Sequence, residues 1–297
     1  MPRHRTTARG VFLLLFASLG LAVGVSGATA KVPALIFPIV GAATYSDDFG
    51  DARGQGSHEG NDLMSTRKAP AVAVEAGKVS FWTTSSRAGC MLYLYGASGT
   101  KYLYIHLNND LTARNDNRGT CKPGVSYAEG LKDGAKVRAG QLIGYVGDSG
   151  DADGAEPHLH FELHPNGGSA VSPYRYLRKA TRLLFNAKPG ARIWLALDGT
   201  VAATPAGTLE LKVRKLQVWP SKEVVTLSRK LVLALAADVE VALPRDLPSL
   251  QVKTGLAALK VGLPVTVQTA PRAASLAMQR GDANALTATR IVLGPSP

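Results

Sequence analysis

Short apolar runs separated by glycine-rich turns dominate the chain between residues 37 and 177. Runs of this length that are bounded by turn residues are typical of β-strands rather than helices. The pattern therefore predicts a compact antiparallel β domain. Its strands are expected in six stretches, at residues 72–74, 79–82, 91–95, 102–107, 141–146 and 159–163. Asparagine, aspartate and glycine between residues 108 and 134 predict a long exposed loop that carries Cys121.

The pattern changes near residues 178–190, where a short apolar and basic segment leads to Pro189 and Gly190. We interpret residues 181–190 as a linker. Beyond it, apolar and polar side chains alternate at residues 209–214, 231–235, 239–243 and 265–267. A period of two predicts strands, so residues 191–297 are expected to form a small accessory β-barrel or sandwich. No His or Cys occurs among these residues, and no metal site is expected there.

The first 30 residues have the composition of an export signal. Arg3, Arg5 and Arg9 precede an apolar run at residues 11–25, and a small–x–small pattern ends at Ala30. This order predicts a signal peptide at residues 1–30 that is cleaved on secretion, which leaves no membrane span. The protein would then act outside the cell, in the wall or in the periplasm. A retained N-terminal anchor is the alternative.

Charge and cysteine content refine this picture. Removing residues 1–30, which hold three basic and no acidic residues, lowers the formal charge from +12 to +9. A chain this basic is expected to adsorb to polyanions such as wall polymers, but its scattered positive charges do not indicate a nucleic-acid partner.

Cys90 and Cys121 are the two cysteines. An even pair in an exported chain favours a disulfide, and two free thiols are the alternative.

Two histidines share one of the predicted strands, in the segment PHLHFEL. Side chains two residues apart lie on the same face of a strand. The apolar residues Leu159, Phe161 and Leu163 are therefore expected to face the core. His158, His160 and Glu162 are expected to project together from the other face.

The segment YIHL holds another histidine, and the same alternation applies to it. Leu103, Ile105 and Leu107 are expected on one face of its strand. Tyr102, Tyr104 and His106 are expected on the other. Packing of a core explains the apolar residues of both strands, but it does not explain the histidines.

A catalytic zinc site needs three nitrogen or oxygen ligands and an open position for water. His58, Asp62 and His160 provide such a set for one ion per chain. His106 and His158 then remain as imidazoles suited to proton transfer. The order His58-Glu59 does not continue as H-E-x-x-H, because position 62 is aspartate. The other two histidines, His4 in the export signal and His164 in a predicted turn before Pro165, are given no role.

The motifs FPIVG, FGDAR, HEGND, YIHL, VRAGQLIGYVGDSG and PHLHFEL occur in this order. Together they resemble the lysostaphin/LytM-type zinc endopeptidases over residues 37–177, about half of the chain. The resemblance implies the compact β fold of that family (the duplicated hybrid motif), with a substrate groove across the sheet. It implies His58, Asp62 and His160 as zinc ligands, and His106 and His158 as the catalytic histidines. The insertion at residues 108–134 and the cysteine pair depart from the family pattern, which leaves the fitting cross-bridge open.

The resemblance also implies a function. We expect residues 31–180 to form a secreted zinc metalloendopeptidase that hydrolyses peptide bonds in peptidoglycan stem peptides or cross-bridges. An alternative is a non-catalytic cell-wall-binding protein or an activator of other wall hydrolases, although every ligand position is filled. Another is a phosphocarrier that uses paired histidines without a metal. The export signal argues against it, because phosphoryl donors are cytoplasmic.

Overall fold

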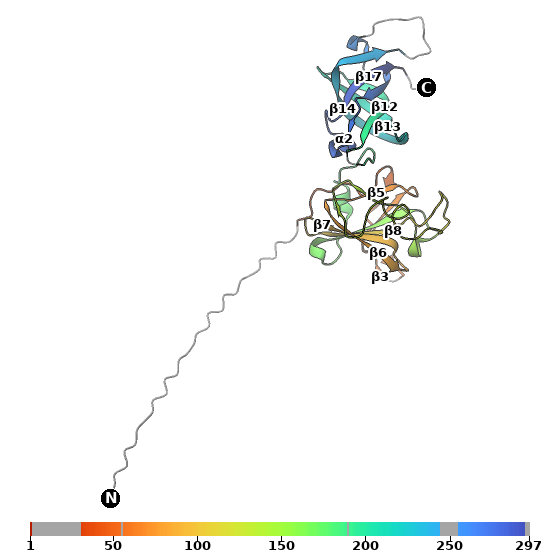
Figure 1. Cartoon of the computed structure of the whole chain (residues 1–297), viewed down its shortest axis with the longest axis vertical. Helices are drawn as coiled ribbons and strands as arrows, with labels where there is room; N and C mark the ends of the chain where they lie inside the picture. The colour runs from red at the N-terminus through yellow and green to blue at the C-terminus, as the bar shows by residue number, and fades with distance from the viewer. Residues whose placement is uncertain (2–30, 55, 189, 244–254, 295–297) are drawn as a thin grey trace.

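The computed structural model describes Met1 and residues 31–54, 56–188, 190–243 and 255–294. The predicted signal peptide therefore falls almost entirely outside the described residues. The strands of the described chain surround two hydrophobic cores, and Figure 1 shows the first region in orange to green and the second in teal to blue. No helix in the described part is long and apolar enough to span a membrane.

A seven-stranded antiparallel sheet is the centre of the first region. Its strands, in order across the sheet, are β1 (Ala43–Thr44), β4 (Asn61–Ser65), β11 (His158–His164), β8 (Lys101–Leu107), β7 (Gly89–Gly96), β6 (Gly77–Ser85) and β9 (Lys136–Val137). Two smaller ladders pair β5 (Pro70–Val72) with β10 (Leu142–Tyr145), and β2 (Ala52–Arg53) with β3 (Gly56–Ser57). The helical pieces are short: η1 (Gly150–Ala152), η2 (Pro165–Gly167) and α1 (Tyr174–Leu177). The prediction of a mainly antiparallel β domain is confirmed.

One face of this sheet packs on the core. Leu159, Phe161 and Leu163 of β11 are fully buried, as their alternation predicts. Tyr102 and Tyr104 of β8 are also fully buried and contact the Phe161 ring, with centroids 5.9 and 5.3 Å away. Burying a side chain such as Phe161 stabilises the fold by about 1.5–3 kcal/mol. The core therefore holds β8 and β11 side by side, and the opposite face is left for chemistry.

Residues 108–134 form a loop, but the prediction that this loop is exposed is wrong for its second half. Tyr127 is fully buried and stacks on Phe81, with ring centroids 3.8 Å apart. Its hydroxyl donates to the Met91 carbonyl oxygen at 3.0 Å. A disulfide between Cys90 and Cys121 joins the first half of the loop to β7. The Tyr127 ring is buried because it is apolar and fills the core. Polar residues dominate the composition of the loop around it, and they led to the prediction of exposure.

The second region is a closed barrel. Its strands pair in the order β12 (Arg192–Ala203), β13 (Thr208–Trp219), β14 (Glu223–Ala242), β17 (Thr287–Leu293) and β15 (Pro264–Thr269), and β15 pairs with β12 again. The β14–β17 pair is parallel, and the other pairs are antiparallel. A single strand, β14, covers the alternating stretch at residues 231–235 and most of that at 239–243. The short elements β16 (Arg272–Ala273), η3 (Leu256–Ala258) and α2 (Leu276–Arg280) complete the region.

The segment between the regions packs against both cores. Leu183 belongs to a small cluster with Ile36 and Val72 of the first region. Leu184 and Phe185 are buried in the barrel core. Residues 183–185, which lie in the segment interpreted as a linker, are thus buried rather than open to solvent.

Candidate metal centre

Antiparallel pairing of β4 with β11 places His160 directly opposite Asp62. Opposed residues of neighbouring strands point to the same face of the sheet. His58 lies four residues before Asp62, and its Nε2 atom is 3.1 Å from Asp62 Oδ1 and 2.9 Å from His160 Nδ1. The remaining pair, His160 Nδ1 and Asp62 Oδ1, is 3.0 Å apart. The structure thus brings the three predicted ligands together. One ligand atom from each residue lies within 4.8 Å of the ligand atoms of the other two.

Gly60 allows this close approach. A Cβ atom at this position would lie 2.6 Å from the Phe161 carbonyl oxygen and 2.8 Å from His160 Nε2. Both separations are shorter than van der Waals contact. The glycine between His58 and Asp62 is therefore required because β11 and the His160 ring lie directly over it.

The partners of each ring determine which nitrogen faces the cluster. His58 Nδ1 lies 2.8 Å from the Asp48 carbonyl oxygen, which only accepts, so this nitrogen donates and Nε2 is left for the cluster. The Arg53 guanidinium, which is also 3.1 Å from His58 Nδ1, donates to Asp62 Oδ2 at 2.8 Å and leaves Oδ1 facing inward. His160 Nε2 is 3.1 Å from the Glu162 carboxylate, so Nδ1 faces the cluster. Each of the three groups therefore presents one nitrogen or oxygen atom to the same point.

The cluster favours positive charge. Burial raises the pKa of Asp62, but hydrogen bonds with His160 and His58 outweigh burial and hold this pKa far below its usual range. Burial lowers the pKa of His160, yet the carboxylates of Asp62 and Glu162 raise it to about 9. A proton on His160 Nδ1 supplies positive charge at this point, and a divalent cation would replace it.

The two further histidines lie beside the cluster. His158 Nε2 is 3.9 Å from Asp62 Oδ1, and the His158 and His106 ring centroids are 5.1 Å apart. Each Nδ1 atom is 2.8 Å from a backbone carbonyl oxygen, that of Glu156 for His158 and that of Ser149 for His106. Each Nε2 is therefore free of that backbone contact. Burial, together with the neighbouring His158, lowers the pKa of His106 to about 4, so this ring is neutral near pH 7.

His106 reaches this face by a route that the alternation does not predict. Grouping His106 with Tyr102 and Tyr104 was wrong, because the two tyrosines lie in the core. Two residues of β8, Ile105 and His106, oppose Met91 alone, so the register shifts by one. His106 has φ of +59° at this bulge. The extra residue turns its ring away from the core, as bulges beside active sites do.

His164 was predicted to lie in a turn without a role, and the structure corrects this. It is the last residue of β11 and only 8% exposed. Its Nε2 atom is 2.7 Å from Glu162 Oε2, and its Nδ1 atom is 2.8 Å from the Gly168 carbonyl oxygen. The contact was not predicted, because Pro165 directly after His164 indicates a turn in the sequence. The one available signal is the spacing of two residues that puts His164 on the same face as His160 and Glu162.

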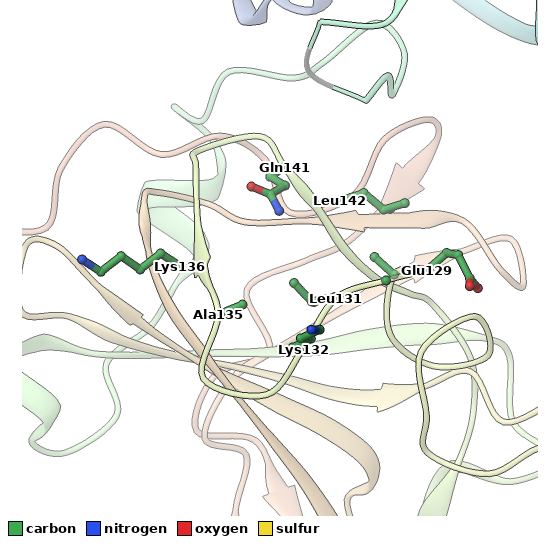
Figure 2. A pocket seen from close by; sticks show the side chains of 9 residues that line it. Glu129, Leu131, Lys132, Ala135, Lys136, Gln141 and Leu142 are labelled. Atoms are coloured by element: carbon green, nitrogen blue, oxygen red, sulfur yellow. The ribbon is translucent and has the colours of Figure 1, made fainter.

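A cavity of about 290 Å³ lies elsewhere in the first region. Figure 2 shows that its walls come from the loop that precedes β9 and from the turn that leads into β10. Glu129, Lys132 and Lys136 are among its lining residues, and none of the five candidate site residues lines it. The candidate centre is therefore on the sheet face and not in this cavity.

An antiparallel sheet that carries a histidine and aspartate cluster on its open face resembles the LytM-type peptidase domains. Residues 124–173, which include His158 and His160, match the model of Peptidase family M23.

Curated relatives cover the same part of the chain. The chain is 28% identical over 156 residues to an L-Ala--D-Glu endopeptidase of Bacillus subtilis, across 49% of this chain and 43% of that protein. It is 31% identical over 116 residues to the DD-carboxypeptidase/endopeptidase Mpg of Neisseria meningitidis, across 39% of this chain and 22% of that protein. The matches thus span less than half the length of these relatives.

Solved structures are similar to about half of the chain. One is the catalytic domain of lysostaphin from Staphylococcus simulans, at 25% identity and a TM-score of 0.36, which covers 46% of this chain and 92% of that chain. Another is a putative glycyl-glycine endopeptidase LytM from Ruminococcus gnavus, at 28% identity and a TM-score of 0.38, which covers 49% and 59%.

Proposed function

We propose that this protein is a secreted zinc metalloendopeptidase that hydrolyses peptide bonds in peptidoglycan stem peptides or cross-bridges. The observation that carries the proposal is the convergence of His58, Asp62 and His160 on one point, beside two further histidines. The match to Peptidase family M23 and the endopeptidases among the relatives support it. Secretion rests on the export signal in the sequence.

The three converging groups suit one zinc ion. Two imidazole nitrogens and one carboxylate oxygen form a ligand set of the kind found in catalytic zinc sites. When bound, zinc lowers the pKa of water toward about 7 and polarises a carbonyl group. The hydrogen bonds behind His58 and His160 orient both rings for this role, as outer-sphere partners do in metal sites.

His106 and His158 are proposed to move protons. Because each Nδ1 donates to a backbone carbonyl, each Nε2 can accept the proton of an attacking water and return it to the amine that leaves. Burial lowers the pKa of His106 to about 4, which keeps its Nε2 lone pair unprotonated at neutral pH. The two rings are neighbours, with centroids 5.1 Å apart.

The barrel is proposed to be an accessory domain. Residues 191–297 hold 13 basic and 7 acidic residues and neither His nor Cys. Catalysis is therefore assigned to the first region. The basic excess of the second region suits contact with anionic wall polymers.

Substitutions that sort ligands from proton-transfer residues test the proposal. Asp62→Ala, His160→Ala and His58→Ala should purify with little zinc. His106→Ala and His158→Ala should keep near-stoichiometric zinc but hydrolyse substrate about 10²–10⁴-fold more slowly. Zinc is measured by metal analysis, and cleavage by mass spectrometry of fragments from purified peptidoglycan of several bacteria.

Glu59→Gln is the matched control, because Glu59 is exposed beside His58. It should match the wild type in zinc content and turnover. A zinc-free His158→Ala with a zinc-loaded His160→Ala would reverse the assignment. Full hydrolysis by both Asp62→Ala and His160→Ala would refute the peptidase proposal.

A further inference from the structure

A row of three polar side chains stands on the open face of β11. His160, Glu162 and His164 are two residues apart and share this face of the strand. Glu162 uses one carboxylate oxygen for each neighbour: Oε1 is 3.1 Å from His160 Nε2, and Oε2 is 2.7 Å from His164 Nε2. Glu162 is only 7% exposed. Its orientation is therefore set by the two rings rather than by water.

The outer ring is held at both of its nitrogens. The Gly168 carbonyl oxygen, 2.8 Å from His164 Nδ1, only accepts a hydrogen bond. The Glu162 carboxylate also only accepts. Both nitrogens of His164 therefore donate, so the ring is a cation beside a carboxylate, which is a short charge-assisted contact. Neither residue has a part in the proton transfers assigned to His106 and His158.

We propose that His164 is a positioning residue for the metal centre, acting through Glu162. His164 holds Oε2, and the carboxylate then keeps Oε1 against His160 Nε2–H. This contact fixes the tautomer of His160 and points its Nδ1 at the site shared with His58 and Asp62. The inference rests on the proposed function, since it requires the centre to bind zinc. Loss of such outer partners typically weakens metal binding by about 10–100-fold.

Two amide substitutions separate the contacts of His164. In His164→Asn the amide nitrogen takes the place of Nδ1, which keeps the donor to Gly168 and removes the donor to Glu162. In His164→Gln the amide nitrogen takes the place of Nε2, which keeps the donor to Glu162 and removes the other. If His164 only fastened the end of β11, the Gln variant would bind zinc more weakly than the Asn variant. If His164 acts through Glu162, the Asn variant binds zinc more weakly than the Gln variant.

The experiment measures the zinc dissociation constant of the full chain by competition with a chromophoric chelator. We expect Glu162→Gln to bind zinc about 10–100-fold more weakly than the wild type. His164→Asn should show a smaller loss in the same direction, and His164→Gln should stay within about 2-fold of the wild type. The double variant Glu162→Gln/His164→Asn should bind like Glu162→Gln alone, because a residue that acts through a partner adds nothing once the partner is changed. Glu59→Gln again serves as the control.

Unfolding in the presence of chelator identifies any variant that fails to fold, and the comparison then rests on the folded variants. Wild-type zinc affinity in His164→Asn, or additive losses in the double variant, would overturn the positioning role and leave the proposed function intact. A wild-type chain that binds no zinc would refute the proposed function itself, and the positioning role with it.

Discussion

Replacing Gly60 by alanine tests how closely β4 and β11 must approach. The added Cβ would lie 2.6 Å from the Phe161 carbonyl oxygen and 2.8 Å from His160 Nε2. The oxygen belongs to the backbone of β11, next to the pair formed by His160 and Asp62. It cannot move away unless the two strands separate. Overpacking of this kind costs about 1–3 kcal/mol.

Two measurements follow from this estimate. At roughly 2–4 °C per kcal/mol for a domain of this size, Gly60→Ala should lower the Tm by roughly 2–12 °C in the presence of chelator. Displacement of the His160 ring should also weaken zinc binding. If the zinc dissociation constant rises about 100-fold, the stabilisation by a saturating fixed zinc concentration falls by about 2.7 kcal/mol. The loss of Tm should therefore be larger with zinc than with chelator.

Gly54→Ala is the matched control, since a Cβ there meets nothing within 4 Å. It should leave Tm and zinc affinity unchanged. A Gly60→Ala variant with wild-type Tm and zinc affinity would show that the strands tolerate the methyl group, which would refute the explanation of this glycine.

Three further outcomes are expected. The disulfide closes a 31-residue separation between Cys90 and Cys121, which should contribute about 3–4 kcal/mol to the free energy of unfolding. The double variant Cys90→Ser/Cys121→Ser should therefore unfold at a lower denaturant concentration. Alkylation of the native wild type without reductant should modify no thiol. The pKa of His106 is about 4 when folded against about 6.5 when unfolded, so the unfolded chain binds more protons and stability falls as pH drops through this window. In chelator, protonation of His106 should lower the free energy of unfolding by about 2 kcal/mol between pH 8 and pH 5. His106→Asn, which tolerates the positive φ, should lose less stability over the same range. Equal pH slopes for the two chains would contradict the assignment. A chain that ends at Lys188 should still bind zinc in chelator competition. It should unfold at a lower temperature, because Leu184 and Phe185 lose the barrel core against which they pack. Loss of zinc binding in a folded truncation would show that the barrel shapes the site.

The pattern of β11 could be predicted because the strand is regular. Its period of two is unbroken from His158 to His164, so the sequence alone separates the core residues from His158 and His160. The convergence of His58 on the same point is not a matter of period. It was predicted from the ligand chemistry of zinc and from the resemblance, since nothing in the local pattern places residue 58 beside residue 160.

The errors fall where the backbone departs from regular geometry or where a contact is specific to this chain. At His106, a bulge with positive φ reverses the face, and neither hydrophobicity nor charge marks a bulge. At His164, a following proline indicates a turn, although the strand continues to that residue. Tyr127 lies among polar residues that indicate exposure, yet its ring fills the space beneath Phe81. Each depends on tertiary contacts that no window of sequence contains.

The closed barrel bears on how copies of this protein meet each other. Every barrel strand has two neighbours, but β14 pairs with β13 over residues 223–234 and with β17 over residues 234–242, so each half of this strand has a strand neighbour on one side alone. The sheet of the first region ends in β1 and β9, which are two residues each. Short or closed edges prevent strand-by-strand stacking of chains. A second chain could therefore add backbone pairing along β14 rather than at the short edges of the first sheet.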